Sequence, residues 1–292
     1  MIERKIAETE LILNADGSVF HLCLSPGEIA DNIILVGDQN RVQTVSEMFD
    51  SVDVRKHNRE FISHTGTYRG KRISVVSTGI GTDNIDIVVN ELDALVNIDL
   101  QSRMVKGERS ALNFVRIGTS GALQGDIDTN TPVVAAMAAG LDGLLNFYAD
   151  RNTVVNLDIE AAFMAHTAWN ALLARPYFVD ASADLLAQVG TGWRKGITAS
   201  APGFYGPQGR VLRLPIIDND VNEKFARFEF NGLQITNYEM ECSAIYGLSA
   251  LLGHNALTVC NVIANRSQKQ FGGSYKDAMA GLIGQVLDRL CV

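Results

Sequence analysis

The stretch LNFVRIGTSGAL, Leu112 to Leu123, indicates the fold class of this chain. Its first half is an apolar run typical of a strand buried in a sheet, and its Gly/Thr/Ser/Gly segment predicts a turn from Gly118 to Gly121. Arg116 lies inside the apolar run. Because a buried unpaired charge is strongly unfavourable, we expect Arg116 to meet either a bound anion or an internal carboxylate. Backbone N–H groups and hydroxyls of the predicted turn would suit a phosphate group.

Further apolar runs predict strands that alternate with helices along the chain. Such alternation is typical of a mostly parallel or mixed sheet covered by helices. No Pro- or Ser-rich linker, repeat or low-complexity segment divides the 292 residues, so we predict a single α/β domain. The expected strands are Ile33–Val36, Ile73–Ser77, Phe114–Ile117, Thr131–Met137, Lys195–Ala199, Gln234–Asn237 and Leu257–Ala264, and the expected helices include Ile85–Asn97, Ile159–Ala174 and Tyr275–Cys291.

Composition excludes several classes of protein. The net charge of −8 argues against nucleic-acid binding, which needs a basic surface. The chain shows no charged-then-apolar leader and no apolar run long enough to span a bilayer, so we expect no membrane association. The four cysteines have neither metal-ligand spacing nor a secreted framework, which favours reduced thiols in a cytoplasmic protein and no metal site. They are Cys23, Cys242, Cys260 and Cys291.

The segment FYGPQGR, Phe204 to Arg210, combines aromatic rings, a side-chain amide and a guanidinium in one short bend. A planar heterocycle with a carbonyl–NH–carbonyl edge, such as uracil, needs these partners. One ring of the aromatic pair could lie against it, the amide could donate to and accept from its edge, and the guanidinium tolerates negative charge on it. The glycines and the proline are also ordinary turn residues, so a plain surface turn is the alternative interpretation.

Two more segments carry groups suited to a phosphorylated sugar. In ILVGDQNRV, Ile33 to Val42, a strand leads into Gly37 and then Arg41, which could bind an oxyanion; the alternative is a helix start capped by Asp38. In TNYEMECSAIYGL, Thr236 to Leu248, a strand end precedes a helix and two carboxylates flank a methionine. Such carboxylates can bind ribose hydroxyls while the thioether packs on the sugar, although acidic residues at a helix start often serve only the helix dipole.

Together these segments resemble the nucleoside phosphorylase superfamily, and within it the uridine phosphorylases. Four further motifs match in the same order along the chain: VFHLCL (Val19–Leu24), NREF (Asn58–Phe61), STGIG (Ser77–Gly81) and NVIANR (Asn261–Arg266). The resemblance implies a nucleoside phosphorylase-type fold, with a central mixed and partly barrel-like sheet flanked by helices. It places this domain in residues 19–292, preceded by an N-terminal extension, residues 1–18, without chemistry of its own.

The resemblance also implies a role for each matching residue. Phosphate would be held by Gly37, Arg41, Arg116 and Thr119, with Arg59 reaching in from a neighbouring subunit. Ribose would be held by Met240 and Glu241, with Glu239 nearby and His21 of the neighbour at the 5′-hydroxyl. The base would lie against Phe204, with Gln208 and Arg210 at its edge and Ile263 and Ala264 lining the pocket. Such sharing implies a homo-oligomer, either a dimer or a hexamer of dimers.

The expected reaction is phosphorolysis of uridine or deoxyuridine to uracil and a pentose 1-phosphate. The sequence offers no Ser-His-Asp or Cys-His arrangement and no metal cluster, which leaves electrostatic catalysis by Arg210, Gln208, Glu241 and Arg116. The alternatives are a purine nucleoside phosphorylase, a nucleosidase of the same superfamily, or a sensor without turnover. A purine-type site usually has an aspartate shortly after the last strand, where this chain has Arg266, Ser267 and Gln268.

Some positions depart from the family pattern. Gln39 replaces the usual proline after Gly37 and Asp38, which predicts a less rigid turn. In some relatives, a glutamate matching Glu60 and the residues after STGIG form a monovalent-cation site between subunits. This chain has Thr82, Asp83 and Asn84 where a Pro-Ser pair is usual, which weakens the case for that ion, so we predict no cofactor besides the co-substrate phosphate. The stretch 98–113 is longer than the bacterial pattern.

Overall fold

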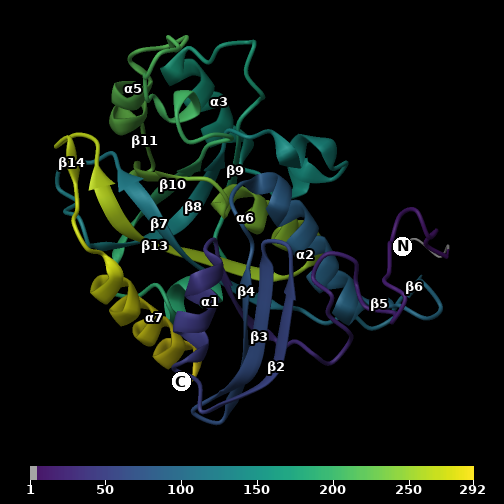
Figure 1. The fold of residues 1–292 in the computed structure, drawn as a ribbon. Helices are drawn as coiled ribbons and strands as arrows, with labels where there is room; N and C mark the ends of the chain where they lie inside the picture. The colour runs from purple at the N-terminus through teal and green to yellow at the C-terminus, as the bar shows by residue number, and fades with distance from the viewer. Residues whose placement is uncertain (1–4) are drawn as a thin grey trace.

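A mixed 12-stranded sheet organises the chain in the computed structural model, which describes residues 5–292 (Figure 1). Its strands are β1 (Asn32–Val36), β2 (Ser51–Asn58), β3 (Phe61–Tyr68), β4 (Lys71–Ser77), β7 (Asn113–Ala122), β8 (Pro132–Gly140), β9 (Tyr177–Asp180), β10 (Arg194–Ser200), β11 (Glu229–Phe230), β12 (Leu233–Glu239), β13 (Asn255–Asn265) and β14 (Gln270–Phe271). The strand order is β11-β12-β10-β8-β13-β7-β1-β4-β3-β2, with β9 beside β8 and β14 beside β13. Strand β12 also pairs with β7, and this contact closes β7, β12, β10, β8 and β13 into a barrel. The predicted single α/β domain with a mixed, partly barrel-like sheet is confirmed.

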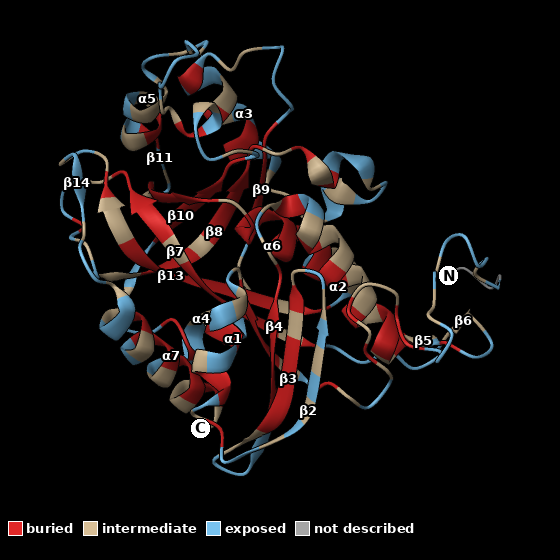
Figure 2. Cartoon of the chain, in the orientation of Figure 1, coloured by how far each residue is buried: buried red, intermediate tan, exposed pale blue. Residues whose placement is uncertain are grey.

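Helices cover the sheet on both sides. Alternate residues of β1 point to opposite faces. Ile33 and Leu35 pack in one core with α2 (Thr82–Asn97) and α6 (Cys242–Leu252), whereas Ile34 and Val36 pack in another with α1 (Gln39–Ser46) and α7 (Lys276–Leu290). Figure 2 shows the buried strands between these helical layers. The helices are α1 (Gln39–Ser46), α2 (Thr82–Asn97), α3 (Leu157–Thr167), α4 (Ala183–Gln188), α5 (Val221–Arg227), α6 (Cys242–Leu252) and α7 (Lys276–Leu290), with 3-10 turns η1 (Leu144–Phe147), η2 (Arg151–Thr153) and η3 (Gly206–Gln208).

The predicted turn at Gly118–Gly121 is wrong, because β7 continues through it to Ala122. Strand β13 pairs alongside, with Asn261 opposite Thr119, so the backbone of this segment is hydrogen-bonded as a strand. Gly118 therefore does not form part of a phosphate-binding turn, as the sequence predicted, and its lack of a side chain has another consequence. A Cβ at Gly118 would collide with the guanidinium of Arg116, two residues back on the same face of the strand. The glycine therefore makes room for the Arg116 side chain.

The predicted helix Ile159–Ala174 is confirmed only as far as Thr167, where α3 ends. Its start is set by Asn156, whose side chain accepts the first backbone N–H groups of the helix. The helix stops because Ala168 adopts a left-handed conformation, with φ of 49°. The side chain of Asn170 then accepts the N–H of Leu172, a local bond that competes with helix continuation.

Strands β2 and β3 were not expected from the sequence. Along β2, exposed and half-buried residues alternate at the edge of the sheet, so the segment contains no apolar run. Part of the predicted N-terminal extension, residues 1–4, lies outside the described residues. The rest lies against the long 98–113 stretch, which forms the hairpin β5 (Ile98–Asp99) and β6 (Met104–Val105): Ile6 N donates to Arg103 O at 2.9 Å and Arg103 Nη1 donates to Leu11 O at 2.6 Å. In residues 5–292, no helix combines the length and apolar character needed to cross a membrane.

Candidate functional site

The expected site residues gather where parallel strands end. Strands β1, β4, β7 and β13 run parallel to one another, and β8, β10 and β12 form a second parallel group that pairs antiparallel with the first. Open α/β sheets bind ligands at the carboxyl ends of such strands, because the following turns present backbone N–H groups and side chains there. The segments after β1, β4, β10 and β12 and the second half of β7 supply the groups described below.

Arg116 is buried and pairs with two carboxylates. Its Nη1 lies 3.1 Å from Glu239 Oε2, and its Nη2 forms a short hydrogen bond to Glu241 Oε2. Of the two expected kinds of partner, the internal carboxylate is therefore present, and it comes from the residues assigned to ribose. Burial lowers the pKa of Arg116, but the two carboxylates outweigh it and raise the pKa above its ordinary value.

The two carboxylates are held differently. Glu239 Oε2 accepts the N–H groups of Glu241 and Cys242, both at 2.9 Å, so Glu239 caps the start of α6, as in the alternative interpretation of this motif. Glu241 Oε1 accepts the N–H of Gly81, at the start of α2, at 2.8 Å. Met240 lies between them and is half-buried. The Arg116 cluster, defined as Arg116, Glu239 and Glu241, thus joins β7, β12 and the starts of two helices.

A second buried guanidinium, Arg41, lies close to Arg116. Its Nη1 donates to Ile117 O at 3.2 Å, and the pKa of Arg41 is lowered by burial and then by the charge of Arg116. Within residues 5–292, no carboxylate forms an ion pair with Arg41. Arg41 is therefore a buried cation that lies close to a second cation and has no carboxylate partner in the described chain. This arrangement favours binding of an anion between or beside the two guanidiniums. Of the other expected phosphate residues, Gly37 follows β1 and Thr119 is half-buried on β7.

The alternative for the Gly37–Arg41 segment is also present, since the side chain of Asp38 caps α1 by accepting the N–H of Asn40 at 3.0 Å. Capping and anion binding do not compete here, because Asp38 is exposed and Arg41 is buried one turn further along.

In the FYGPQGR segment, Gln208 is buried between two arginines. Its Oε1 accepts from Arg210 Nη1 at 2.7 Å and from Arg266 Nη2 at 2.8 Å, and its backbone carbonyl accepts from Arg266 Nη1 at 2.6 Å. The Arg210 guanidinium also lies 3.7 Å from the centre of the Phe204 ring. The expected base-reading residues are therefore together, and the segment is more than a surface turn because it is anchored to the end of β13.

Arg266 is the residue that our sequence reasoning missed. Its sequence signal is its place at the end of the NVIANR motif, directly after β13, where a purine-type site usually has an aspartate. Burial and then the charge of Arg210 lower the pKa of Arg266 to about 10. The expected lining residues, Ile263 and Ala264, are half-buried just before it, where the pairing of β13 with β7 shifts register.

His21 and Arg59, the residues expected to serve a neighbouring subunit, lie at one corner of the protein. His21 Nδ1 contacts Glu91 Oε1 at 2.6 Å, and its carbonyl accepts from Asn58 Nδ2 at 2.8 Å. Arg59 is exposed at the tip between β2 and β3, with φ of 52°. Gln39, which replaces the usual proline, donates to Arg59 O at 2.7 Å and so ties the tip to the start of α1. Neither His21 nor Arg59 hydrogen-bonds to the Arg116 cluster within the described chain.

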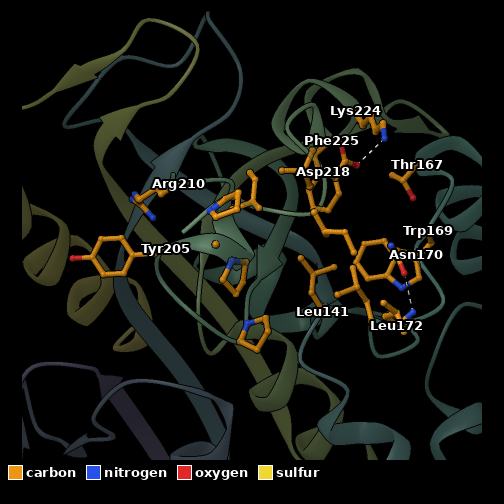
Figure 3. Close-up of a pocket in the computed structure, with 18 of the residues that line it drawn as sticks. Leu141, Thr167, Trp169, Asn170, Leu172, Tyr205, Arg210, Asp218, Lys224 and Phe225 are labelled. Carbon is orange, nitrogen blue, oxygen red and sulfur yellow. Dashed lines mark hydrogen bonds and ion pairs between the residues drawn. The ribbon is translucent and has the colours of Figure 1, made fainter. Parts of the chain in front are cut away.

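A pocket of about 990 Å³ lies next to the FYGPQGR segment, and Tyr205 and Arg210 are among its lining residues (Figure 3). Figure 3 shows Arg210 and Tyr205 on one side of it and Trp169, Leu172 and Phe225 on the other. Its walls are mainly apolar, and neither the Arg116 cluster nor Gln208 lines it. The pocket therefore borders the FYGPQGR segment, and none of the residues expected at phosphate lines it.

Comparisons with known proteins agree with this arrangement. A family model described as "Phosphorylase superfamily" matches residues 31–287. Uridine phosphorylase of Thermococcus kodakarensis is 31% identical over 275 residues, which cover 93% of this chain and 86% of that protein. DeoD-type purine nucleoside phosphorylase of Listeria welshimeri is 32% identical over 243 residues, which cover 83% of this chain and 85% of that protein.

Among solved structures, a Trypanosoma brucei nucleoside phosphorylase described as showing uridine phosphorylase activity has a TM-score of 0.84 and 29% sequence identity. The match covers 96% of this chain and 99% of the trypanosomal one. The relatives thus include proteins named for uridine and proteins named for purine nucleosides. Similarity alone does not choose between these two classes of base.

Proposed function

Because this chain belongs to the phosphorylase superfamily and is a pentosyltransferase, we propose that it catalyses phosphorolysis of uridine, with deoxyuridine as a second candidate. The products are uracil and ribose 1-phosphate (or its deoxy analogue), which places the enzyme in pyrimidine salvage. The observation that carries the choice of base is the Gln208 side chain held between Arg210 and Arg266.

The hydrogen bonds of Gln208 favour a pyrimidine dione. Because both guanidiniums donate to Oε1, the amide nitrogen of Gln208 is left to donate to a carbonyl oxygen of the base. Arg210 and Arg266 stabilise the negative charge that develops on uracil as the N-glycosidic bond breaks. The base stacks on Phe204, which is exposed, and Ile263 and Ala264 line the pocket.

Phosphate and sugar occupy the other end of the site in this proposal. Arg41 and Arg116 bind phosphate together with Gly37, Thr119 and Arg59 of a neighbouring subunit. Glu241, which accepts two hydrogen bonds within residues 5–292, has lone pairs left for the ribose hydroxyls. Met240 packs against the sugar, Glu239 lies nearby, and His21 of the neighbour meets the 5′-hydroxyl. Phosphate then attacks the anomeric carbon from the face opposite the departing base.

The other three candidate functions, a purine nucleoside phosphorylase, a nucleosidase and a sensor without turnover, have less support from the arrangement of side chains. A purine base needs a proton donor for N7, and the position after β13 holds Arg266, which donates to Gln208 instead. A nucleosidase has no use for the pair of buried cations formed by Arg41 and Arg116, and neither has a sensor that does not turn over. The unpaired state of all four cysteines is consistent with the cytoplasmic location that we propose.

The first test of the function is dependence on phosphate. We expect uracil release from uridine, followed by ultraviolet absorbance, to require inorganic phosphate. Glu241→Ala should lower kcat/KM for uridine by about ten- to a thousandfold while changing the KM for phosphate less, because it removes the acceptor of the sugar hydroxyls. Glu241→Gln keeps the shape of the side chain and serves as the matched variant. Uracil release that persists in phosphate-free buffer would identify a nucleosidase, and inosine used better than uridine would identify a purine enzyme.

The second test concerns shared active sites. Arg59→Ala and Arg210→Ala subunits should each be nearly inactive alone, because each lacks one half of every site. After subunit exchange, an equal mixture of dimers should recover about a quarter of wild-type activity, since half the dimers are mixed and each contains one complete site. Exchange is verified with differently tagged subunits. A mixture that exchanges but stays inactive, or a monomer with full activity, contradicts the sharing.

A further inference from the structure

Ser200 is a buried hydroxyl that touches the Arg116 cluster and has been given no role so far. It ends β10 and lies opposite Glu239 in the pairing of β10 with β12. Its Oγ donates a short hydrogen bond to Glu239 Oε1 and accepts the N–H of Ser243 at 2.9 Å. Ser200 thus connects the Glu239 carboxylate to the first turn of α6.

We propose that Ser200 is a positioning residue, which acts on the substrate through Glu239 and Arg116 without touching it. This inference deepens the proposed function and rests on it, since it concerns the same site. Ser200 orients Glu239, and Glu239 in turn holds the Arg116 guanidinium and the start of α6 where phosphate and ribose bind.

The hydrogen bonds of Glu239 indicate that this carboxylate positions other groups of the site. It accepts from Ser200 Oγ, from the N–H groups of Glu241 and Cys242, and from Arg116. Three of these donors converge on Oε2 and the Ser200 hydroxyl bonds Oε1, so Glu239 has less acceptor capacity left for ribose than Glu241 has. Glu241, with two donors, keeps its capacity. The two carboxylates of the motif therefore divide the work: Glu241 binds and Glu239 positions.

The partner of Ser200 on the helix side is itself anchored. Ser243 Oγ donates to Asp142 Oδ2 at 2.8 Å, and Tyr177 OH donates to Asp142 Oδ1 at 2.9 Å. Asp142 Oδ1 also accepts the N–H of Leu144 at 2.8 Å. These hydrogen bonds connect α6 to β9 and to the segment after β8, so they help to fix the position of Ser243 and, through it, of the Ser200 hydroxyl.

The ionisation of Glu239 offers a readout specific to this contact. The groups that face it are Arg116 from β7, Glu241 and Cys242 from the start of α6, and Cys260 from β13. Burial raises the pKa of Glu239, while Arg116 and the Ser200 hydroxyl lower it. Loss of the hydroxyl therefore raises this pKa further, so that the ion pair with Arg116 is lost at a higher pH.

The test compares Ser200→Ala with Thr198→Val. Thr198 lies two residues earlier on β10, is equally buried, and donates to Asn237 Oδ1 on β12 at 3.0 Å, away from Glu239. Each variant loses one buried hydroxyl between the same two strands. We expect Ser200→Ala to lose about ten- to a hundredfold in kcat/KM for uridine and to shift the acid limb of its pH profile upward. Thr198→Val should keep the wild-type pH profile and lose less than about threefold.

A double-mutant cycle with Glu239→Gln shows whether Ser200 acts through Glu239. If it does, adding Ser200→Ala to Glu239→Gln costs little further activity, whereas independent effects multiply. Ser200→Thr, which keeps the hydroxyl, covers the case in which Ser200→Ala does not fold, and should retain the wild-type acid limb. Equal profiles for Ser200→Ala and Thr198→Val, multiplicative effects, or a shifted limb in Ser200→Thr overturn the positioning role alone. A wild-type protein that releases no uracil from uridine and phosphate overturns both this role and the proposed function.

Discussion

Arg116→Ala is expected to abolish phosphorolysis and to destabilise the protein. Removing the guanidinium leaves Glu239 and Glu241 as buried carboxylates without their cation, which costs about 3–5 kcal/mol in the free energy of unfolding. It also removes one of the cations that bind phosphate in the proposed function, so kcat/KM for phosphate should fall by about a thousandfold or more. Urea unfolding and initial rates at several phosphate concentrations measure the two effects separately.

The stability loss of Arg116→Ala should depend on pH in a definite direction. Burial and the nearby Glu241 carboxylate raise the pKa of Glu239 while Arg116 lowers it, so without Arg116 the folded-state pKa of Glu239 lies further above the unfolded value. The folded state then binds more protons than the unfolded state, so the variant should gain stability relative to wild type as the pH falls from 8 towards 5. A stability gap that stays constant over this range would contradict the assignment of the loss to unpaired carboxylates.

Arg151→Ala is the matched control for Arg116→Ala. Arg151 Nη2 pairs with the fully buried Glu160 Oε2 at 2.7 Å, beside α3 and outside the Arg116 cluster. Its removal also breaks a buried ion pair, so stability should fall while the KM for phosphate stays close to wild type. If both variants lose phosphate affinity equally, the effect of Arg116 comes from general loosening of the fold.

Gln208→Ala is the second change with a large expected effect. It leaves Arg210 and Arg266 without their shared acceptor and removes the donor for the base carbonyl. Turnover of uridine should fall by about one to three powers of ten, since a buried hydrogen-bonding edge is left unpaired and the leaving uracil is less stabilised. Arg210→Ala should lower the turnover of uridine by a similar factor. Both variants should fold normally. Steady-state rates with uridine and deoxyuridine measure the loss.

Gln124→Ala separates the base contact from a general effect of losing a glutamine. Gln124 Nε2 donates to the carbonyls of Ala226 and Ile235 at 3.0 and 2.8 Å, away from the base-reading residues. This variant should lose stability but keep uridine turnover within about threefold of wild type. Near-normal turnover in Gln208→Ala would remove the base assignment, and with it the argument for uridine over a purine nucleoside.

Features that depend on neighbours along the chain were predictable from the sequence. Every strand that we predicted from an apolar run is present in the structure. A strand buried on both faces needs continuous hydrophobic residues wherever it lies in the sheet. The helices α2 and α7 followed from the same local pattern. The FYGPQGR segment could be recognised because Phe204, Gln208 and Arg210 lie within one bend, so their proximity requires no knowledge of the fold. Strand β2 was missed because an edge strand with one solvated face carries no apolar run.

The partners of the buried arginines could be learned only from the tertiary structure. The sequence limited Arg116 to an anion or a carboxylate, since burying it unpaired is too costly, but the choice depended on which strands become neighbours. Glu241 is 125 residues from Arg116 in the chain, and the two meet because β12 pairs with β7 to close the barrel. Arg266 likewise reaches Gln208, 58 residues away, only because β13 ends beside that loop. Ion pairs and hydrogen bonds act over a few ångströms in space and leave no period in the sequence, so their pairing is set by sheet order and register.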